Sequence, residues 1–158
     1  MAKPVQVQQT IVQFFKDRKY NYDIEQKEAW VLFSTFKGVQ DNDSIGIVFV
    51  VHNNDINVTA TFLQPVNKDS YSSIAEILLK INNYLKRGHF FLDYSIGAVN
   101  FKIWNSAKGR FTGKDVDELL LMSIGSVETV MKVIRRFTQK EITVDQAVSA
   151  YIKQEDIR

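Results

Sequence analysis

The stretch Ser44–Leu63, SIGIVFVVHNNDINVTATFL, decides the fold of this chain. Apolar residues take every second position in both halves of it: Ile45, Ile47, Phe49 and Val51, then Ile56, Val58, Ala60 and Phe62. The segment His52–Asp55 between them is typical of a turn, because Asn and Asp tolerate left-handed backbone. Two alternating runs joined by so short a turn predict antiparallel strands over Ser44–His52 and Ile56–Leu63.

Upstream of this hairpin, the pattern predicts one helix and two more strands. Apolar residues at helical spacing indicate a helix over about Val5–Lys19. Tyr20–Ile24 alternates like a short strand, and Ala29–Phe36 is rich in β-forming residues.

Downstream of Pro65 the apolar spacing changes to the helical period, with Ile74, Ile77, Leu78, Ile81 and Leu85 on one face. Ser73–Glu76 fits a capping box at the start of this helix, and Gly88 fits the left-handed position after its end. His89–Tyr94 and Ala98–Trp104 then form a second predicted hairpin.

Two helices are predicted to complete the chain. The first is long, over about Gly113–Phe137, and the second is capped at Thr143 and reaches about Lys153. The predicted order is helix, four strands, helix, two strands, helix, helix. It indicates an α+β fold of two layers, an antiparallel sheet with helices packed on it. We expect residues 1–137 to form the domain, and residues 138–158 to extend it as a C-terminal amphipathic helix.

The composition excludes several kinds of chemistry. The chain has 158 residues and no cysteine, which excludes disulfides, thiolate metal sites and a cysteine nucleophile. His52 and His89 are the two histidines, and neither belongs to a metalloprotease or serine-hydrolase motif. We therefore expect no enzyme activity, no cofactor and no bound metal.

The sequence also indicates where the protein resides. No segment approaches the roughly 18 apolar residues of a membrane span, and the N-terminus lacks a signal-peptide pattern. We therefore expect a cytoplasmic location without membrane association.

The charge is nearly balanced, at a formal +2 from 20 Lys plus Arg and 18 Asp plus Glu. Basic residues gather at predicted helix C-termini, where they offset the helix dipole. One such cluster, Lys132, Arg135 and Arg136, leaves a nucleic-acid-associated regulator as the alternative function, although nucleic acid is not the partner we expect.

The informative feature is a surplus of apolar residues on the strands. Val48 and Val50 lie on the face opposite Phe49, and Val31 and Phe33 lie opposite Leu32. A sheet with one wet face alternates more cleanly. Either helices cover both faces, or another chain covers the second face or the wide apolar arc of the third helix. The candidate partner or dimer surface comprises Val31, Phe33, Val48, Val50, Leu121, Ile124, Val148, Tyr151 and Ile152.

The stretch Ile81–Asp93, INNYLKRGHFFLD, resembles the YbjN family of bacterial sensory transduction regulators, which is similar in fold to type III secretion chaperones. The likeness extends to the N-terminal helix leading into Tyr20–Asp23 and to the return strand Val99–Phe101, and spans about residues 8–137. It implies a dimeric α+β domain without cofactor or known reaction. It also implies structural roles for four motif residues: Asn82, Gly88, Phe90 and Asp93.

Together these observations predict a non-catalytic, chaperone-like regulator that forms a homodimer and binds a polypeptide partner. The partner either adds to a sheet edge or fills an apolar groove.

Overall fold

The computed structural model describes residues 4–40 and 42–156. The chain begins with the helix α1 (Pro4–Asp17). Four strands follow it: β1 (Asp23–Gln26), β2 (Trp30–Lys37), β3 (Ser44–His52) and β4 (Asp55–Phe62). A short 3-10 turn η1 (Lys68–Ser70) leads into α2 (Tyr71–Asn82). The chain continues through β5 (His89–Asp93), β6 (Ala98–Ser106), α3 (Gly113–Thr138) and α4 (Val144–Asp156). The predicted α+β order is confirmed.

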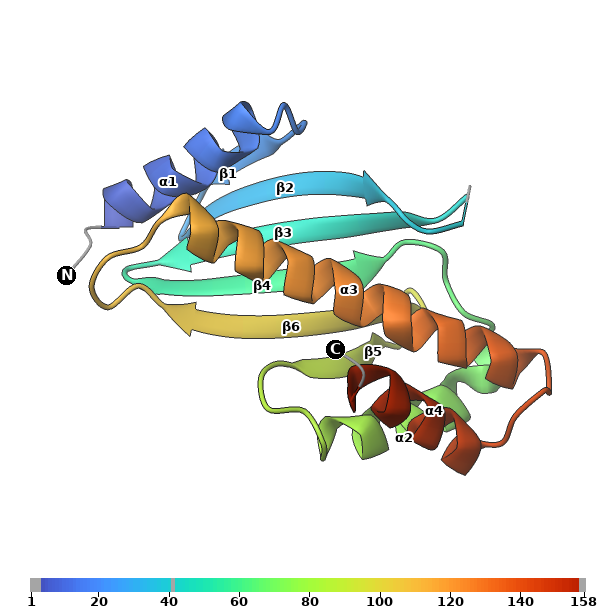
Figure 1. Ribbon diagram of the computed structural model, residues 1–158. Helices are drawn as coiled ribbons and strands as arrows, with labels where there is room; N and C mark the ends of the chain where they lie inside the picture. Colours follow the sequence, from blue (N-terminus) through green and yellow to red (C-terminus); the bar gives the residue numbers. More distant parts are fainter. Residues whose placement is uncertain (1–3, 41, 157–158) are drawn as a thin grey trace.

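The six strands form one antiparallel sheet in the order β1-β2-β3-β4-β6-β5 (Figure 1). The hairpin quoted above is the centre of this sheet, with Phe49 opposite Val58 and Val51 opposite Ile56. Both outer strands are short: β1 pairs with only the first half of β2, and β5 with only the first half of β6.

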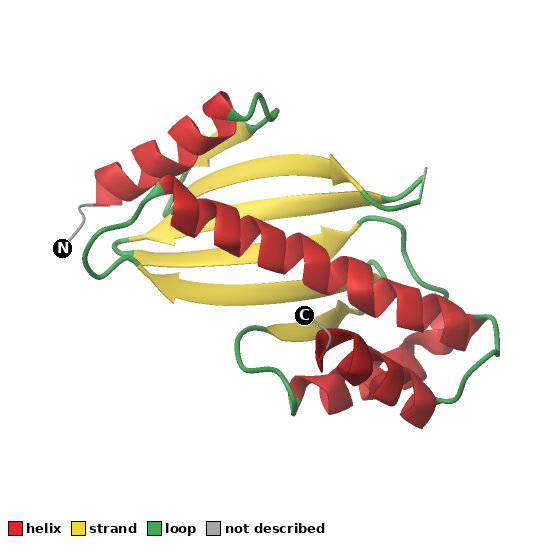
Figure 2. Cartoon of the chain, viewed as in Figure 1, coloured by secondary structure: helices red, strands yellow, loops and turns green. Residues whose placement is uncertain are grey.

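All four helices lie on the same face of the sheet (Figures 1 and 2). Phe15 of α1 packs its ring edge-on against Phe49 of β3, at 5.9 Å between ring centroids. Tyr151 of α4 does the same against Phe90 of β5, at 5.6 Å. Both strand residues point to the helical side, so one core joins sheet and helices. The explanation that helices cover both faces of the sheet is therefore wrong.

The start of α2 differs from the prediction. The helix begins at Tyr71, directly after η1, and not at a capping box formed by Ser73 and Glu76. The local cap is Asn67, whose side chain accepts a hydrogen bond from the Asp69 amide. The two later helices do begin with reciprocal caps, Thr112 with Asp115 and Thr143 with Gln146.

The role of Gly88 also differs in part. It has the expected positive φ of 75°, but α2 has already ended at Asn82. Gly88 instead ends a connecting segment and introduces β5. A Cβ there would lie 2.9 Å from the Lys102 carbonyl oxygen and would collide with the Phe101 ring. Only glycine fits this close approach.

Candidate functional site

The face of the sheet without helices, called the open face below, carries apolar side chains on its central strands. The register places Val31 beside Val50, and Phe33 beside Val48. The three valines are half-buried by their neighbours, while Phe33 is 39% exposed. The structure thus gathers four of the predicted surface residues into one patch across β2 and β3.

The rest of the open face combines polar residues with the exposed aromatic side chains of Trp104 and Phe91. On β4, Asn57 and Thr59 continue the two rows of the patch. Further along, the Thr61 hydroxyl donates to the Asn100 side-chain oxygen at 2.5 Å, and the Asn100 side-chain nitrogen donates to the Ala98 carbonyl. These bonds satisfy the polar groups of the buried Asn100 within the chain.

Charge is distributed asymmetrically along the same rows. Asp23 and Glu25 of β1 stand beside Phe33 and Val31 at one edge. Lys102 and Trp104 of β6 stand at the other side, beyond Thr59 and Asn57. Across the sheet, the open face therefore runs from acidic through apolar to basic.

The candidate partner-surface residues on the helices α3 and α4 differ in how far they are buried. Leu121 on α3 is 62% exposed, and Ile124 and Ile152 are half-buried. Tyr151 is only 1% exposed and Val148 only 8%, because α4 turns both toward the core. The expectation that these two residues form a partner surface is corrected: each packs within this chain.

The Asn82 side chain ties α2 to β5. Its amide donates to the Phe90 carbonyl at 2.9 Å, and its side-chain oxygen accepts from the Phe90 amide at 2.7 Å. Phe90 itself is buried against Phe101.

Asp93 holds the turn between β5 and β6. One of its carboxylate oxygens accepts from both the hydroxyl and the amide of Ser95, at 2.6 and 2.9 Å. These bonds, the hydroxyl first, lower the pKa of Asp93 below its ordinary value. All four motif residues thus make the structural contacts seen here, and none lies in the apolar patch.

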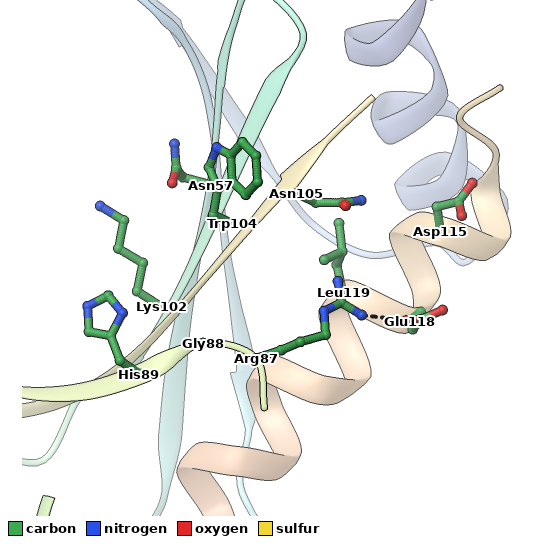
Figure 3. A pocket seen from close by; sticks show the side chains of 10 residues that line it. All are labelled: Asn57, Arg87, Gly88, His89, Lys102, Trp104, Asn105, Asp115, Glu118 and Leu119. Carbon is green, nitrogen blue, oxygen red and sulfur yellow. Dashed lines mark hydrogen bonds and ion pairs between the residues drawn. The ribbon is translucent and has the colours of Figure 1, made fainter. Parts of the chain in front are cut away.

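A cleft of about 780 Å³, which the sequence pattern did not predict, lies beside β6 at the start of β5 (Figure 3). Its walls include Trp104 of β6, which is 57% exposed, and Leu119 of α3. At one end Arg87 reaches across to Glu118 of α3 at 2.9 Å. The alternation of Trp104 with the apolar Val99, Phe101 and Ile103 of the same strand is the sequence signal that could have indicated an exposed aromatic residue here.

Titratable groups form no reactive cluster in the part of the chain that the structure describes. No three His, Cys, Asp or Glu side chains there could together hold a metal ion. The His89 ring lies against Phe91, and His52 is the last residue of β3, beside Asn53.

The basic cluster at the end of α3 is partly committed to the fold. Arg135 pairs with the buried Asp43 at 2.5 Å and stacks over the Phe62 ring. Arg136 pairs with Glu141, which leaves Lys132 as the exposed cation without a partner among the contacts described for this cluster.

Within residues 4–40 and 42–156, no helix has the length and apolar character needed to cross a bilayer.

The fold and the open face define an α+β protein of two layers whose sheet is covered on one side. Among solved structures, the chain is similar to the crystal structure of YbjN, "a putative transcription regulator from E. coli". The match has a TM-score of 0.58 and 15% identity, and covers 84% of this chain and 93% of that chain. The resemblance expected from Ile81–Asp93 is confirmed for the fold.

The sequence comparisons add nothing to this result, since no family model matches the chain. No curated protein matches it either.

Proposed function

We propose that this chain is a non-catalytic, protein-binding regulator whose open face holds its polypeptide partner. The observation that carries the proposal is the patch of Val31, Phe33, Val48 and Val50 on strands that no helix covers. Burying apolar surface contributes roughly 25 cal/mol per Å², and a typical interface covers about 800 Å² on each side. The regulatory part of the proposal rests on the description of YbjN.

A second copy of this chain is the partner that the open face fits. Two sheets can stack face to face about a two-fold axis that lies between them and runs parallel to β3, so that β1 of one copy lies over β6 of the other. Asp23 then faces Lys102 of the second copy, and Val48 and Val50 meet their own counterparts. The acidic-to-basic order along the rows is self-complementary in this arrangement.

The molar mass in solution tests the proposal. The wild type is expected to be a dimer, and Phe33→Asp and Val50→Lys are expected to be folded monomers, because each places a charge inside the apolar contact. Leu121→Lys on α3 is the matched control and is expected to remain dimeric. Light scattering gives the mass, and circular dichroism checks the fold.

Charge reversal tests the expected contact between Asp23 of one copy and Lys102 of the other. Asp23→Lys and Lys102→Asp are each expected to weaken the dimer by about tenfold, and the double reversal is expected to restore part of the affinity. A wild type that is monomeric at every concentration, or dimers that withstand both apolar-patch substitutions, would contradict the proposal.

A further inference from the structure

The outer half of β6 forms a free sheet edge. β5 pairs with β6 from Ala98 to Lys102, and β6 continues to Ser106 with no outer neighbouring strand among residues 4–40 and 42–156. The chain leaves this edge at Gly88, whose positive φ turns the preceding residues away from the line of β5. The part of β6 after Lys102 is therefore paired with β4 on one side and has a free edge on the other.

The register shows which backbone groups are available there. In an antiparallel pair, hydrogen-bonded positions recur at every second residue. The Ala107 amide donates to the Asn54 carbonyl on the β4 side, so Asn105 and Ile103 also direct their backbone groups toward β4. Trp104 and Ser106 consequently direct their amides and carbonyls outward. The carbonyl of Lys102, two residues earlier, lies beside Gly88, as this alternation requires.

The cleft described above follows this edge (Figure 3). Trp104 and His89 lie on its open-face side, and Leu119 of α3 lies on its helical side. The two carboxylates in the cleft are already engaged, since Asp115 caps α3 through Thr112 and Glu118 pairs with Arg87. What remains for a ligand is the outward backbone of β6 with Trp104, His89 and Leu119 beside it, and the polar side chains of Asn57, Lys102 and Asn105.

We propose that this edge binds an extended peptide segment, which adds to the sheet as a short strand beside Trp104 and Ser106. Backbone hydrogen bonds to an exposed edge supply affinity in this mode, and alternate side chains supply selectivity. One set of peptide side chains lies beside Trp104 and His89, which favours large apolar residues at alternate positions. The proposal goes beyond the open face, because it uses the edge of the sheet and a different partner.

Proline substitution tests whether the backbone amide of Ser106, and not its side chain, contributes to peptide binding. Ser106→Pro removes one outward amide and spares the bonds to β4, and proline is tolerated at such edge positions. Ser106→Ala is the matched control, since it keeps the amide. The probe is a set of short, end-blocked peptides in which threonine alternates with valine or phenylalanine, labelled for fluorescence anisotropy. A copy with N-methylated backbone is the control peptide.

The peptides are expected to bind wild type and Ser106→Ala alike, and to bind Ser106→Pro about five- to tenfold more weakly. The N-methylated copy is expected not to bind. In the free protein, the amides of Trp104 and Ser106 should exchange with solvent faster than those of Ile103 and Asn105. Absence of binding by every peptide, or equal binding to Ser106→Pro, would overturn the proposal. Either result would leave the molar-mass test of the open face unaffected.

Discussion

At the scale of single residues, a few side chains fix the junction between α2 and β5. Asn82 bonds both backbone groups of Phe90, and Gly88 admits the Phe101 ring and the Lys102 carbonyl. These residues were singled out from the sequence through a resemblance, but their partners were not predictable. The contacts join segments whose distance apart depends on how α2 packs on the sheet.

Gly88→Ala is expected to destabilise the protein by about 3 kcal/mol or more, since strained backbone and a collision inside the core add together. Gly109→Ala is the matched control. Gly109 has a φ of 100° but nothing within 4 Å of the added methyl group, so we expect a smaller loss of about 1–2 kcal/mol. Urea unfolding measures both. Equal losses would show that the close approach at Gly88 is unimportant.

Ser95→Ala is expected to raise the pKa of Asp93 toward the ordinary value of about 3.9, because the hydroxyl bond to the carboxylate is lost. A lowered folded-state pKa stabilises the fold at pH values above the ordinary pKa. This contribution disappears as the pH falls through the lowered value. NMR titration of the Asp93 carboxyl carbon checks the shift, and an unchanged titration would contradict the hydrogen-bonding account.

At the scale of elements, apolar periodicity predicted the helices and strands in the right order, while the boundaries depended on local contacts. The strand predicted over Tyr20–Ile24 is observed as Asp23–Gln26. Tyr20 instead lies in the segment after α1, where its amide donates to the Phe15 carbonyl and its ring packs against Phe15. An alternating pattern does not reveal such a tertiary contact.

The faces of the elements were predictable only in part. The alternation in β2 and β3 correctly separated Val31, Phe33, Val48 and Val50 from the core. For α4, an amphipathic pattern marks an apolar face without showing what covers it. Tyr151 proved to face Phe90, and Lys80 of α2 pairs with Asp145 of α4 at 2.9 Å.

Tyr151→Ala is therefore expected to cost about 3–5 kcal/mol of folding stability, as for other buried aromatic residues. Ile152→Ala, at a half-buried neighbouring position, is expected to cost clearly less. Chemical denaturation of the two variants gives the comparison. If Tyr151→Ala were as stable as the wild type while the dimer dissociated, α4 would be a partner contact and its assignment to the core would be wrong.

At the scale of the whole molecule, the arrangement is one layer of helices on one sheet. No helix of residues 4–40 and 42–156 lies on the second face of the sheet, and four apolar residues of that face lie together on β2 and β3. The surplus seen in the sequence thus has a structural counterpart. The free edge at Trp104 could not be predicted from the sequence, because it depends on where β5 begins relative to β6, which only the register shows.

Cysteine labelling measures directly whether a partner covers the open face, since the natural chain has no cysteine. Val48→Cys is expected to react rapidly with a thiol reagent in dilute protein, and to become protected as the concentration rises and dimers form. Ile47→Cys, on the helical side, should react slowly throughout. Slow reaction of Val48→Cys at every dilution would mean that this chain covers its own face. Fast reaction at every concentration would mean that no second copy covers it.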